Sequence, residues 1–211
     1  MGEFFTSFEA SWQSFLSRDE PLEVFSDQFP ASPELLAGWF IALDPALWPA
    51  TEALQRALAP ITWLRPYPVR LQHLWLGSLG WGASWSDATI ERRLEQGREA
   101  LDGLARFTLR FPRLNCFHTA VVAEAEADDD RLADLARRLA PHEDTATFLP
   151  HLAVSLATAP GDPRELRDVL VPLRDTSLGH QVVDAVSLGV VPLGQQDFLR
   201  PWTVPGSVAL T

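Results

Sequence analysis

Two histidines lie in similar apolar segments, RLQHLWLGSL (70–79) and FLPHLAVSLA (148–157). The imidazole group has an ordinary pKa of about 6.5, so near neutral pH one ring can be neutral while another is protonated. A neutral ring accepts a proton and a protonated ring donates one, which is the chemistry of general acid–base catalysis. A lone histidine on an apolar strand is usually structural, whereas the pair His73 and His151 could act together.

The residues around each histidine alternate as they do on a half-buried strand. Residues two apart share one face of a strand, so Trp75 is expected beside His73. By the same argument, Ala153 and Ser155 are expected beside His151. These three side chains are therefore the predicted neighbours of the two imidazoles.

The two histidines occupy the same place in two half-chains with one order of elements: strand, helix, strand with histidine, helix, strand. Such an internal repeat predicts two lobes related by a pseudo-twofold axis, with the equivalent strands side by side and a cleft between the lobes. Strands are predicted at 38–43, 70–79, 107–111, 118–125, 148–157, 182–191 and 202–210, and helices at 49–58, about 87–105, 129–140 and 163–173.

These pieces resemble the 2H phosphoesterases, a family that includes the LigT-like RNA 2′,3′-cyclic phosphodiesterases, also called 2′-5′ RNA ligases. The matching segments are WFIAL (39–43), WLRPYPVRLQHLWLGSLG (63–80) and FLPHLAVSLA (148–157). The resemblance covers residues 38–210. It implies an α+β, bilobal fold in which antiparallel sheets line a central cleft and helices lie outside.

The resemblance also implies a reaction. His73 and His151 would be the catalytic acid and base, in either order, and neither a metal nor a cofactor would be required. One imidazole would take a proton from an attacking water or hydroxyl, and the other would protonate the leaving oxygen. The expected partner is a nucleotide or a short RNA end with a 2′,3′-cyclic or 2′-5′ linkage. Tyr67 and Arg70, just before the first motif, are further candidates for substrate contacts.

The chain departs from the family motif, His-x-Thr/Ser, in both halves. Trp75 and Ala153 stand where a hydroxyl would hydrogen-bond the phosphate. Ser155 could supply a hydroxyl only about 7 Å further along its strand, and Trp75 could stack on a base or simply fill space. Three functions therefore remain: an active phosphodiesterase, a catalytically lapsed protein that binds a nucleotide-like ligand or a protein partner, or a scaffold recruited for another small-molecule reaction.

Residues 1–36 differ from the rest and are expected to form an N-terminal extension beside a domain at 37–211. Phe4, Phe8, Trp12 and other aromatics recur at helical spacing, which predicts a short amphipathic helix. The simplest role for this helix is packing on the domain surface. A lid over the cleft and a dimer contact are the alternatives.

The composition narrows the partners. The net charge is −11, and all 17 basic residues are arginine, so long polyanionic nucleic acid is not an expected partner. One cysteine and no secretory signal favour the cytoplasm, and no apolar run approaches the ~20 residues of a membrane span. His118 is interpreted as structural, and His142 and His180 as loop residues. The acidic run at 124–130 is interpreted as a solvated loop.

Overall fold

The computed structural model describes residues 6–31, 34–82, 84–141, 148–195, 199 and 202–211. Phe4 and His142, both named above, lie outside the described residues. No helix in these ranges is long and apolar enough to cross a lipid bilayer.

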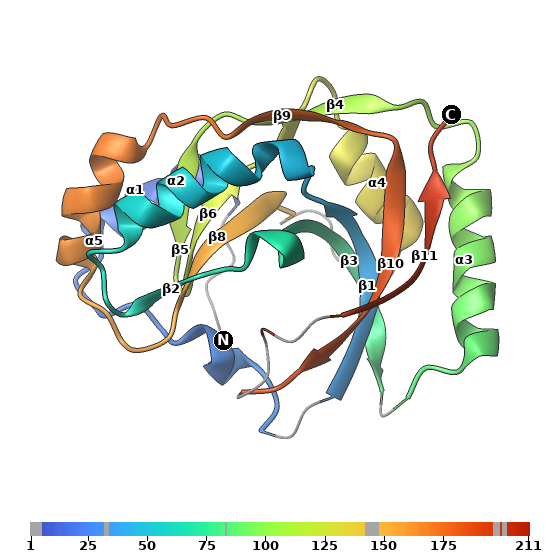
Figure 1. The fold of residues 1–211 in the computed structure, drawn as a ribbon, viewed down its shortest axis with the longest axis horizontal. Helices are drawn as coiled ribbons and strands as arrows, with labels where there is room; N and C mark the ends of the chain where they lie inside the picture. Colours follow the sequence, from blue (N-terminus) through green and yellow to red (C-terminus); the bar gives the residue numbers. More distant parts are fainter. Residues whose placement is uncertain (1–5, 32–33, 83, 142–147, 196–198, 200–201) are drawn as a thin grey trace.

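The strands form two antiparallel sheets, as the predicted α+β class requires (Figure 1). Within the described residues the larger sheet has eight strands in the order β11-β10-β1-β3-β8-β6-β5, with β2 paired to β8 beside this path. The smaller sheet has the order β7-β4-β9. The strands are β1 (Glu34–Ala42), β2 (Leu64–Pro66), β3 (His73–Gly82), β4 (Phe107–Phe111), β5 (Leu114–Phe117), β6 (Ala120–Glu124), β7 (Glu126–Ala127), β8 (His151–Ala157), β9 (Gly179–Val183), β10 (Ala185–Leu193) and β11 (Thr203–Ala209).

The helices begin and end where their local sequence directs. Asp162 caps the last one by accepting a hydrogen bond from the backbone N–H of Arg164. The third ends before the predicted residue 105, because Gly103 adopts a left-handed φ of 72°. The helices are α1 (Phe8–Ser17), α2 (Trp48–Leu58), α3 (Asp87–Leu101), α4 (Arg131–Leu139) and α5 (Pro163–Leu170), with short 3-10 segments that include η1 (Phe25–Gln28) and η3 (Val69–Leu71).

The two histidine strands, β3 and β8, are neighbours in the large sheet and pair at Leu74 and Leu152. Each of these leucines directly follows a histidine, so the pair lies on an approximate twofold axis between the halves. On either side of the axis, β1 pairs with β3 and β6 pairs with β8. The predicted placement of the equivalent strands side by side is confirmed.

The same backbone contacts recur on both sides of this axis. The N–H of Leu43 donates to the carbonyl oxygen of Gln72 at 3.1 Å, and the N–H of Ala125 donates to that of Pro150 at 2.9 Å. Gln72 and Pro150 are the residues immediately before the two histidines. The main chain around the histidines is therefore duplicated in detail.

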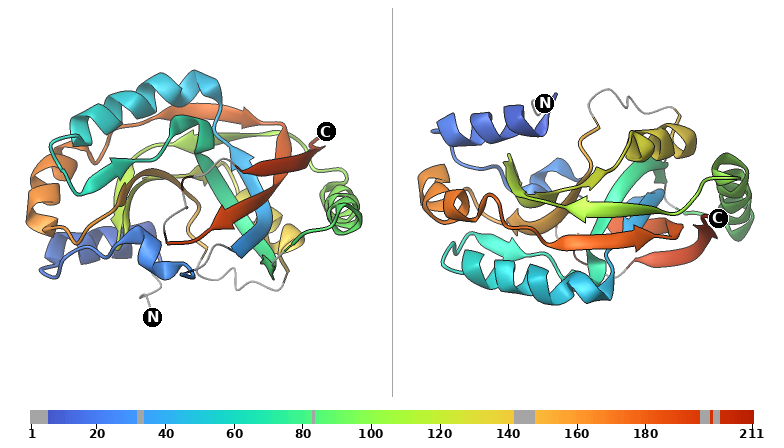
Figure 2. Two further views of the ribbon diagram at one scale, coloured as in Figure 1. Left: turned by 60° about the horizontal axis from the view of Figure 1, so that its bottom comes forward. Right: turned by 90° about the horizontal axis from the view of Figure 1, so that it is seen from above.

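The helices of the two halves are exchanged. α2, from the first half, contacts β8 and α5, whereas α4, from the second half, contacts β3 and α3. Figures 1 and 2 accordingly show α3 and α4 at one end of the molecule and α1, α2 and α5 at the other. Each end of the molecule is thus built from both halves of the chain.

The N-terminal helix α1 lies beside β5, at the edge of the large sheet. Its Trp12 and Phe15 are only 7% and 3% exposed, and both belong to the main hydrophobic core. The guanidinium of Arg174 lies over the ring of Trp12, 4.5 Å from its centre. The division between 1–36 and 37–211 and the lid or dimer role of the extension stay predictions.

Four strands, β2, β5, β7 and β9, were not predicted as separate strands. β9 pairs with β4 in the smaller sheet, and it carries the exposed His180, so the prediction that His180 lies in a loop was wrong. His118 lies in a turn before β6, which begins two residues later than predicted. Short strands with distant partners give a weak local signal, because their stability comes mainly from packing against those partners.

Candidate functional site

The two histidines are fixed in the same way. His73 opens β3 and His151 opens β8. The Nδ1 atom of His73 lies 2.8 Å from the carbonyl oxygen of Leu71, and the Nδ1 of His151 lies 2.7 Å from that of Leu149. A carbonyl oxygen only accepts hydrogen bonds, so these contacts assign the proton of each neutral ring to Nδ1. The Nε2 atom of each ring is then the one that can exchange a proton with a ligand.

The strand register places the motif positions of the two halves opposite one another. Continuing the pairing of Leu74 with Leu152 by one residue sets Ala153 across from His73, and Trp75 across from His151. Trp75 and Ala153 therefore each flank the other half's histidine. In this register the two histidines are diagonal neighbours on the paired strands, with roughly 7–8 Å between their Cα atoms.

Burial changes the proton affinity of both rings. It lowers the pKa of His73 to about 4, against the opposing effect of the hydrogen bond to Leu71, and the charge of His151 lowers this pKa further. Burial also lowers the pKa of His151 from its ordinary value. The charge of His151 thus acts on His73, and the lowered pKa of each ring favours its neutral form.

Four aromatic rings enclose His73. The ring centre of Trp202 lies 4.2 Å away in an edge-to-face contact, and those of Phe40, Trp75 and Tyr67 lie 5.8, 5.9 and 6.1 Å away. We call these four residues the aromatic box. Their rings shield His73 partly from water, in line with the lowered pKa. Trp75 and Trp202 are partly exposed, whereas Phe40 and Tyr67 are buried.

Glycines on the neighbouring strands make room for these rings. A Cβ atom at Gly38 on β1 would overlap the indole of Trp75, and one at Gly189 on β10 would lie 2.9 Å from the ring of Phe40. The aromatic box therefore depends on β1 and β10 as well as on β3. Phe40 could have been found from the alternation within 38–43, whereas no local signal pointed to Trp202.

Irregular pairing between β1 and β3 adds a hydroxyl to the cleft face. The register shifts between Trp39 and Phe40 and again between Ala37 and Gly38. As a result Ser78 lies on the side of Trp75 and accepts a hydrogen bond from its Nε1 at 3.2 Å. A regular strand would have placed Gly77 there, so the alternation rule missed Ser78.

The surroundings of His151 are simpler. Phe117 contacts its ring edge-on at a centre-to-centre distance of 4.7 Å. Ala153 belongs to an apolar group on the cleft face that we call the cleft cluster. Its buried members are Tyr67, Ala120, Val122 and Leu156, with Phe25, Leu71, Phe117, Ala153 and Leu199 packed against them.

The remaining candidate residues are placed unequally. Tyr67 is 6% exposed, and burial raises the pKa of its hydroxyl. Ser155 is 1% exposed and is paired with both Pro66 and Val121, so it lies deep within the sheet. Arg70 is exposed on η3, and it makes no ion pair or hydrogen bond with the described residues through its side chain. Of the three, Tyr67 is the one in ring contact with a histidine.

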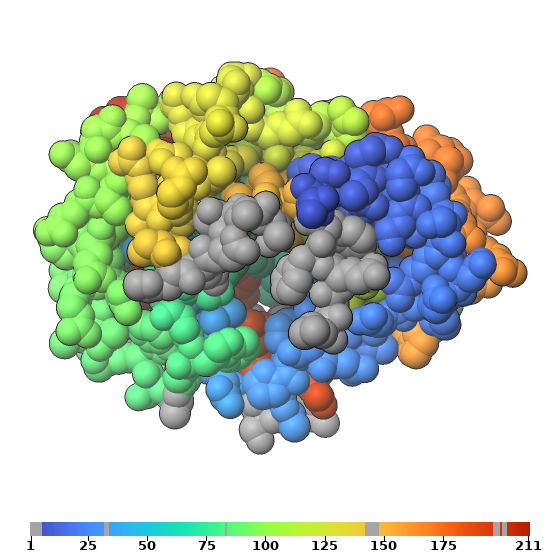
Figure 3. Space-filling view, turned by 180° about the vertical axis from the view of Figure 1, so that it is seen from behind, coloured from blue at the N-terminus to red at the C-terminus, as the bar shows by residue number. Residues whose placement is uncertain are grey.

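Figure 3 shows the molecule from behind, with its surface hollowed near the centre of the view. Red atoms of the C-terminal part of the chain are visible within the hollow, between the blue N-terminal segment and the green part of the chain.

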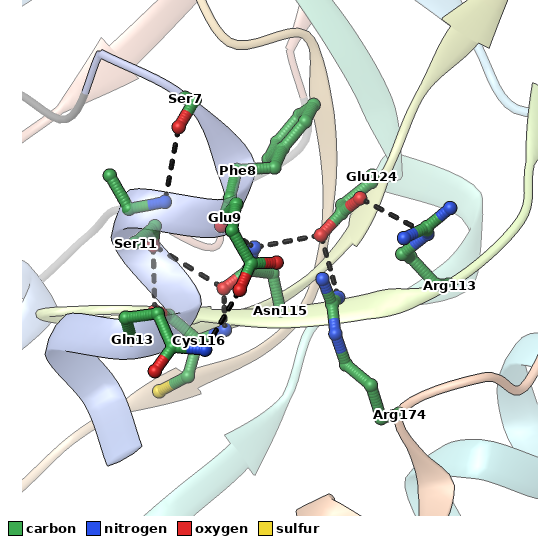
Figure 4. Close-up of polar contacts among 11 residues, drawn as sticks. Ser7, Phe8, Glu9, Ser11, Gln13, Arg113, Asn115, Cys116, Glu124 and Arg174 are labelled. Atoms are coloured by element: carbon green, nitrogen blue, oxygen red, sulfur yellow. Dashed lines mark hydrogen bonds and ion pairs between the residues drawn. The ribbon is translucent and has the colours of Figure 1, made fainter. Parts of the chain in front are cut away.

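A buried carboxylate lies in the strand next to His151. Glu124 pairs in register with His151, is 2% exposed, and forms an ion pair with Arg174 at 2.6 Å. It also contacts Arg113 at 3.6 Å and accepts a hydrogen bond from Nδ2 of Asn115 at 2.8 Å (Figure 4). The interpretation of the acidic run as solvated was therefore wrong at Glu124.

This cluster also anchors the N-terminal helix. Asn115 donates to the carbonyl oxygen of Phe8, and the hydroxyl of Ser11 contacts Oδ1 of Asn115 at 3.3 Å. Buried ion pairs of this kind are costly to break, because they leave an uncompensated charge. No group of three or more potential metal ligands occurs among the residues that the structure describes.

No protein-family model and no curated protein matches the chain. Solved structures do match. The TT0787 protein of Thermus thermophilus superposes with a TM-score of 0.62 at 19% identity, over 83% of this chain and 97% of that one. LigT of E. coli, in its apo form, gives a TM-score of 0.59 at 18% identity, over 85% and 99% of the two chains.

A conserved protein of unknown function from Agrobacterium tumefaciens gives a TM-score of 0.56 at 16% identity, over 92% of this chain and 96% of that one. LigT has also been crystallised with phosphate, NADP+, 3′-AMP and ATP. At these identities the likeness establishes the architecture. The chain has the bilobal α+β fold of the LigT-like 2H phosphoesterase structures.

Proposed function

We propose that the protein is a metal-independent phosphodiesterase that acts on a 2′,3′-cyclic or 2′-5′ linkage at a nucleotide or a short RNA end. One observation carries this proposal. His73 and His151 lie on one face of two paired strands, and each has its Nδ1 bound to the carbonyl oxygen two residues before it. Two imidazoles held in this way can supply both proton transfers of a hydrolysis.

In the proposed reaction, a neutral imidazole accepts a proton at Nε2 from a water molecule as the water oxygen attacks phosphorus. The second imidazole, protonated beforehand, donates its proton to the ribose oxygen as the bond between phosphorus and that oxygen breaks. The products are a phosphomonoester and a free ribose hydroxyl. A net proton transfer between the rings through solvent restores the starting state.

The surroundings of the histidines support a nucleotide-sized substrate. The aromatic box offers flat surfaces, and stacking of a base on one such side chain contributes about 1–3 kcal/mol. LigT, which has the same fold, binds 3′-AMP and ATP in its crystals. The net charge of −11 disfavours a long polyanion, because such binding depends on many cationic contacts.

A second candidate function is binding without turnover. Trp75 and Ala153 supply no hydroxyl, and Ala153 packs within the apolar cleft cluster. The lowered pKa of each imidazole also favours its neutral form, so a general acid forms only when a ligand or a lower pH protonates one of them. These observations favour a nucleotide-like ligand with a flat, apolar part.

Hydrolysis of 2′,3′-cyclic AMP and of a 2′-5′ linked dinucleotide in EDTA distinguishes the two functions. Wild-type protein, His73→Ala and His151→Ala are compared across pH 4 to 8. His180→Ala is the matched control, because His180 is exposed on β9 in the smaller sheet. Turnover that both cleft variants lose, and the control keeps, supports the phosphodiesterase.

The opposite result has a defined meaning. Absence of turnover in folded wild-type protein at every pH excludes the proposed reaction. Binding of 3′-AMP by calorimetry, weakened in Trp75→Ala, would then support the binding function.

A further inference from the structure

A cavity of about 600 Å³ lies outside the histidine cleft, between α3, α4 and the ends of β1 and β3. Trp39 lines it from β1, whereas the next residue, Phe40, belongs to the aromatic box. Successive residues of a strand point to opposite faces, so the cavity and the histidines lie on opposite sides of the sheet. Its volume is within the range of about 300–1,000 Å³ that is typical of small-molecule sites.

The equivalent space at the other end of the molecule is filled. There α2 packs against α5, and the indole of Trp63 lies against Gly161, where a Cβ atom would overlap its ring. The Nε1 of Trp63 donates to Glu165 at 2.8 Å. Leu166 and Leu170 of α5 are 0% exposed. Since the two ends are related by the pseudo-twofold axis, the cavity at the α3–α4 end is not a requirement of the fold.

The polar residues that line the cavity from its two helices are Arg93, Gln96 and Arg138, and none of the lining residues that the structure describes is acidic. Arg93 donates from NH1 to Oε1 of Gln96 at 3.0 Å, which leaves the amide nitrogen of Gln96 to face a ligand as a donor. Arg138 is held by Asp134 at 2.8 Å and by the carbonyl oxygen of Ala100 at 3.2 Å. The polar side chains are thus pre-arranged as donors.

Arg93 has no acidic partner among the described residues. In the part of the chain that the structure describes, Arg93 makes no ion pair, and its Nε is buried without a hydrogen-bond partner. Arg98, also on α3, is paired with Glu91 and Glu95. In a protein with a net charge of −11, an unpaired arginine at a cavity is a local attraction for an anion.

The rest of the lining is apolar and partly flat. Trp39 forms one wall. Its indole lies close to α3 because Gly97 has no side chain, and a Cβ atom at Gly97 would lie 2.6 Å from the indole. Leu79 and Leu139 add aliphatic surface. Trp81, at the same cavity, is 48% exposed, which is unusual for so large an apolar side chain. An indole that a ligand covers would account for this exposure.

We propose that this cavity binds a small organic anion with a flat apolar body. Its carboxylate, sulfonate or phosphate group contacts Arg93, Gln96 and Arg138, and its body lies between Trp39 and Trp81. The site does not depend on the reaction proposed for the cleft.

Titration calorimetry with a matched pair of probes tests the proposal. Naphthalene-2-sulfonate carries the negative charge, and naphthalene-2-sulfonamide has nearly the same shape without it. Wild-type protein is expected to bind the sulfonate about tenfold more tightly than the sulfonamide, because one charge-assisted contact contributes about 1.4 kcal/mol. Arg93→Gln and Arg138→Gln should each reduce this preference, and Arg92→Gln, on the exposed side of α3, should leave it unchanged.

A cavity-filling variant, Ala100→Phe, keeps both arginines and should abolish binding of both probes, with thermal unfolding used to verify the fold. The proposal is overturned if wild-type protein binds neither probe at millimolar concentration, or binds both equally. It is also overturned if Arg93→Gln binds the sulfonate as tightly as wild type does. A loss of the preference for the sulfonate in His73→Ala, but not in Arg93→Gln, would overturn it as well, because the probe would then occupy the cleft.

Discussion

The two halves of the histidine site share a backbone and differ in what surrounds it. His73 and His151 each bind the carbonyl oxygen two residues earlier, and the residue after each one pairs across the pseudo-twofold axis. Beyond the backbone the halves diverge. His73 is enclosed by the aromatic box, whereas His151 has the ring of Phe117 beside it and the buried Glu124 in the adjacent strand.

This difference shows which features of a duplicated site are easily changed. The hydrogen bond to Nδ1 depends on the main chain, so it persists while the strands pair. The proton affinity of each ring depends on neighbouring side chains, which single substitutions alter. Trp75 and Ala153, which stand two residues after the two histidines, differ from each other in this way.

Glu124→Gln should lower the free energy of unfolding by about 3–5 kcal/mol, because it leaves the buried Arg174 without its carboxylate. The equivalent position beside His73 is the exposed Ala42. Ala42→Ser is therefore the matched control, with an expected change within about 0.5 kcal/mol. Urea unfolding of both variants measures the effect. Equal losses would show that the two half-sites do not differ in their dependence on this position.

Ala153→Thr should increase the hydrolysis of 2′,3′-cyclic AMP by about 10²-fold, since it places a hydroxyl donor across from His73. Ala153→Val has nearly the same shape and lacks the hydroxyl, so it should give no increase. Steady-state rates at the optimal pH compare the two variants. Equal rates for the threonine and valine variants would indicate that the cleft does not use a hydroxyl at this position.

The free energy of unfolding should fall as the pH is lowered from about 6.5 to 4. Unfolded His73 binds a proton near pH 6.5, whereas folded His73 resists protonation until about pH 4. The unfolded state thus binds more protons in this window, and the loss should reach about 2–3 kcal/mol. In His73→Asn this part of the loss should disappear. Urea unfolding at each pH measures it, and identical profiles for the two proteins would contradict the prediction.

Trp202→Ala should raise the pKa of His73 by about one unit, because it opens the closest wall of the aromatic box to water. The pKa of His151 should change less, since Phe117 is its ring contact. NMR titration of the two imidazoles measures both values in one experiment. Equal shifts at the two histidines would show that their surroundings are not independent.

The sequence alone predicted much of this molecule. Strong alternation and good helix signals located most of the strands and all five described helices, and the order of the elements revealed the internal repeat. From that repeat the neighbouring positions of His73 and His151 followed, because a pseudo-twofold axis brings equivalent strands together. Local patterns sufficed here since they depend on periodicity within one element.

Other features were decided only by tertiary structure. Trp202 reaches His73 from the C-terminal segment, Ser78 joins the cleft face through irregular pairing, and Glu124 is buried beside two arginines. The cavity at Arg93 exists because α4, from the second half of the chain, packs near α3 from the first. None of these contacts has a local signature. Each depends on the distance between segments far apart in sequence, and packing of the whole fold sets that distance.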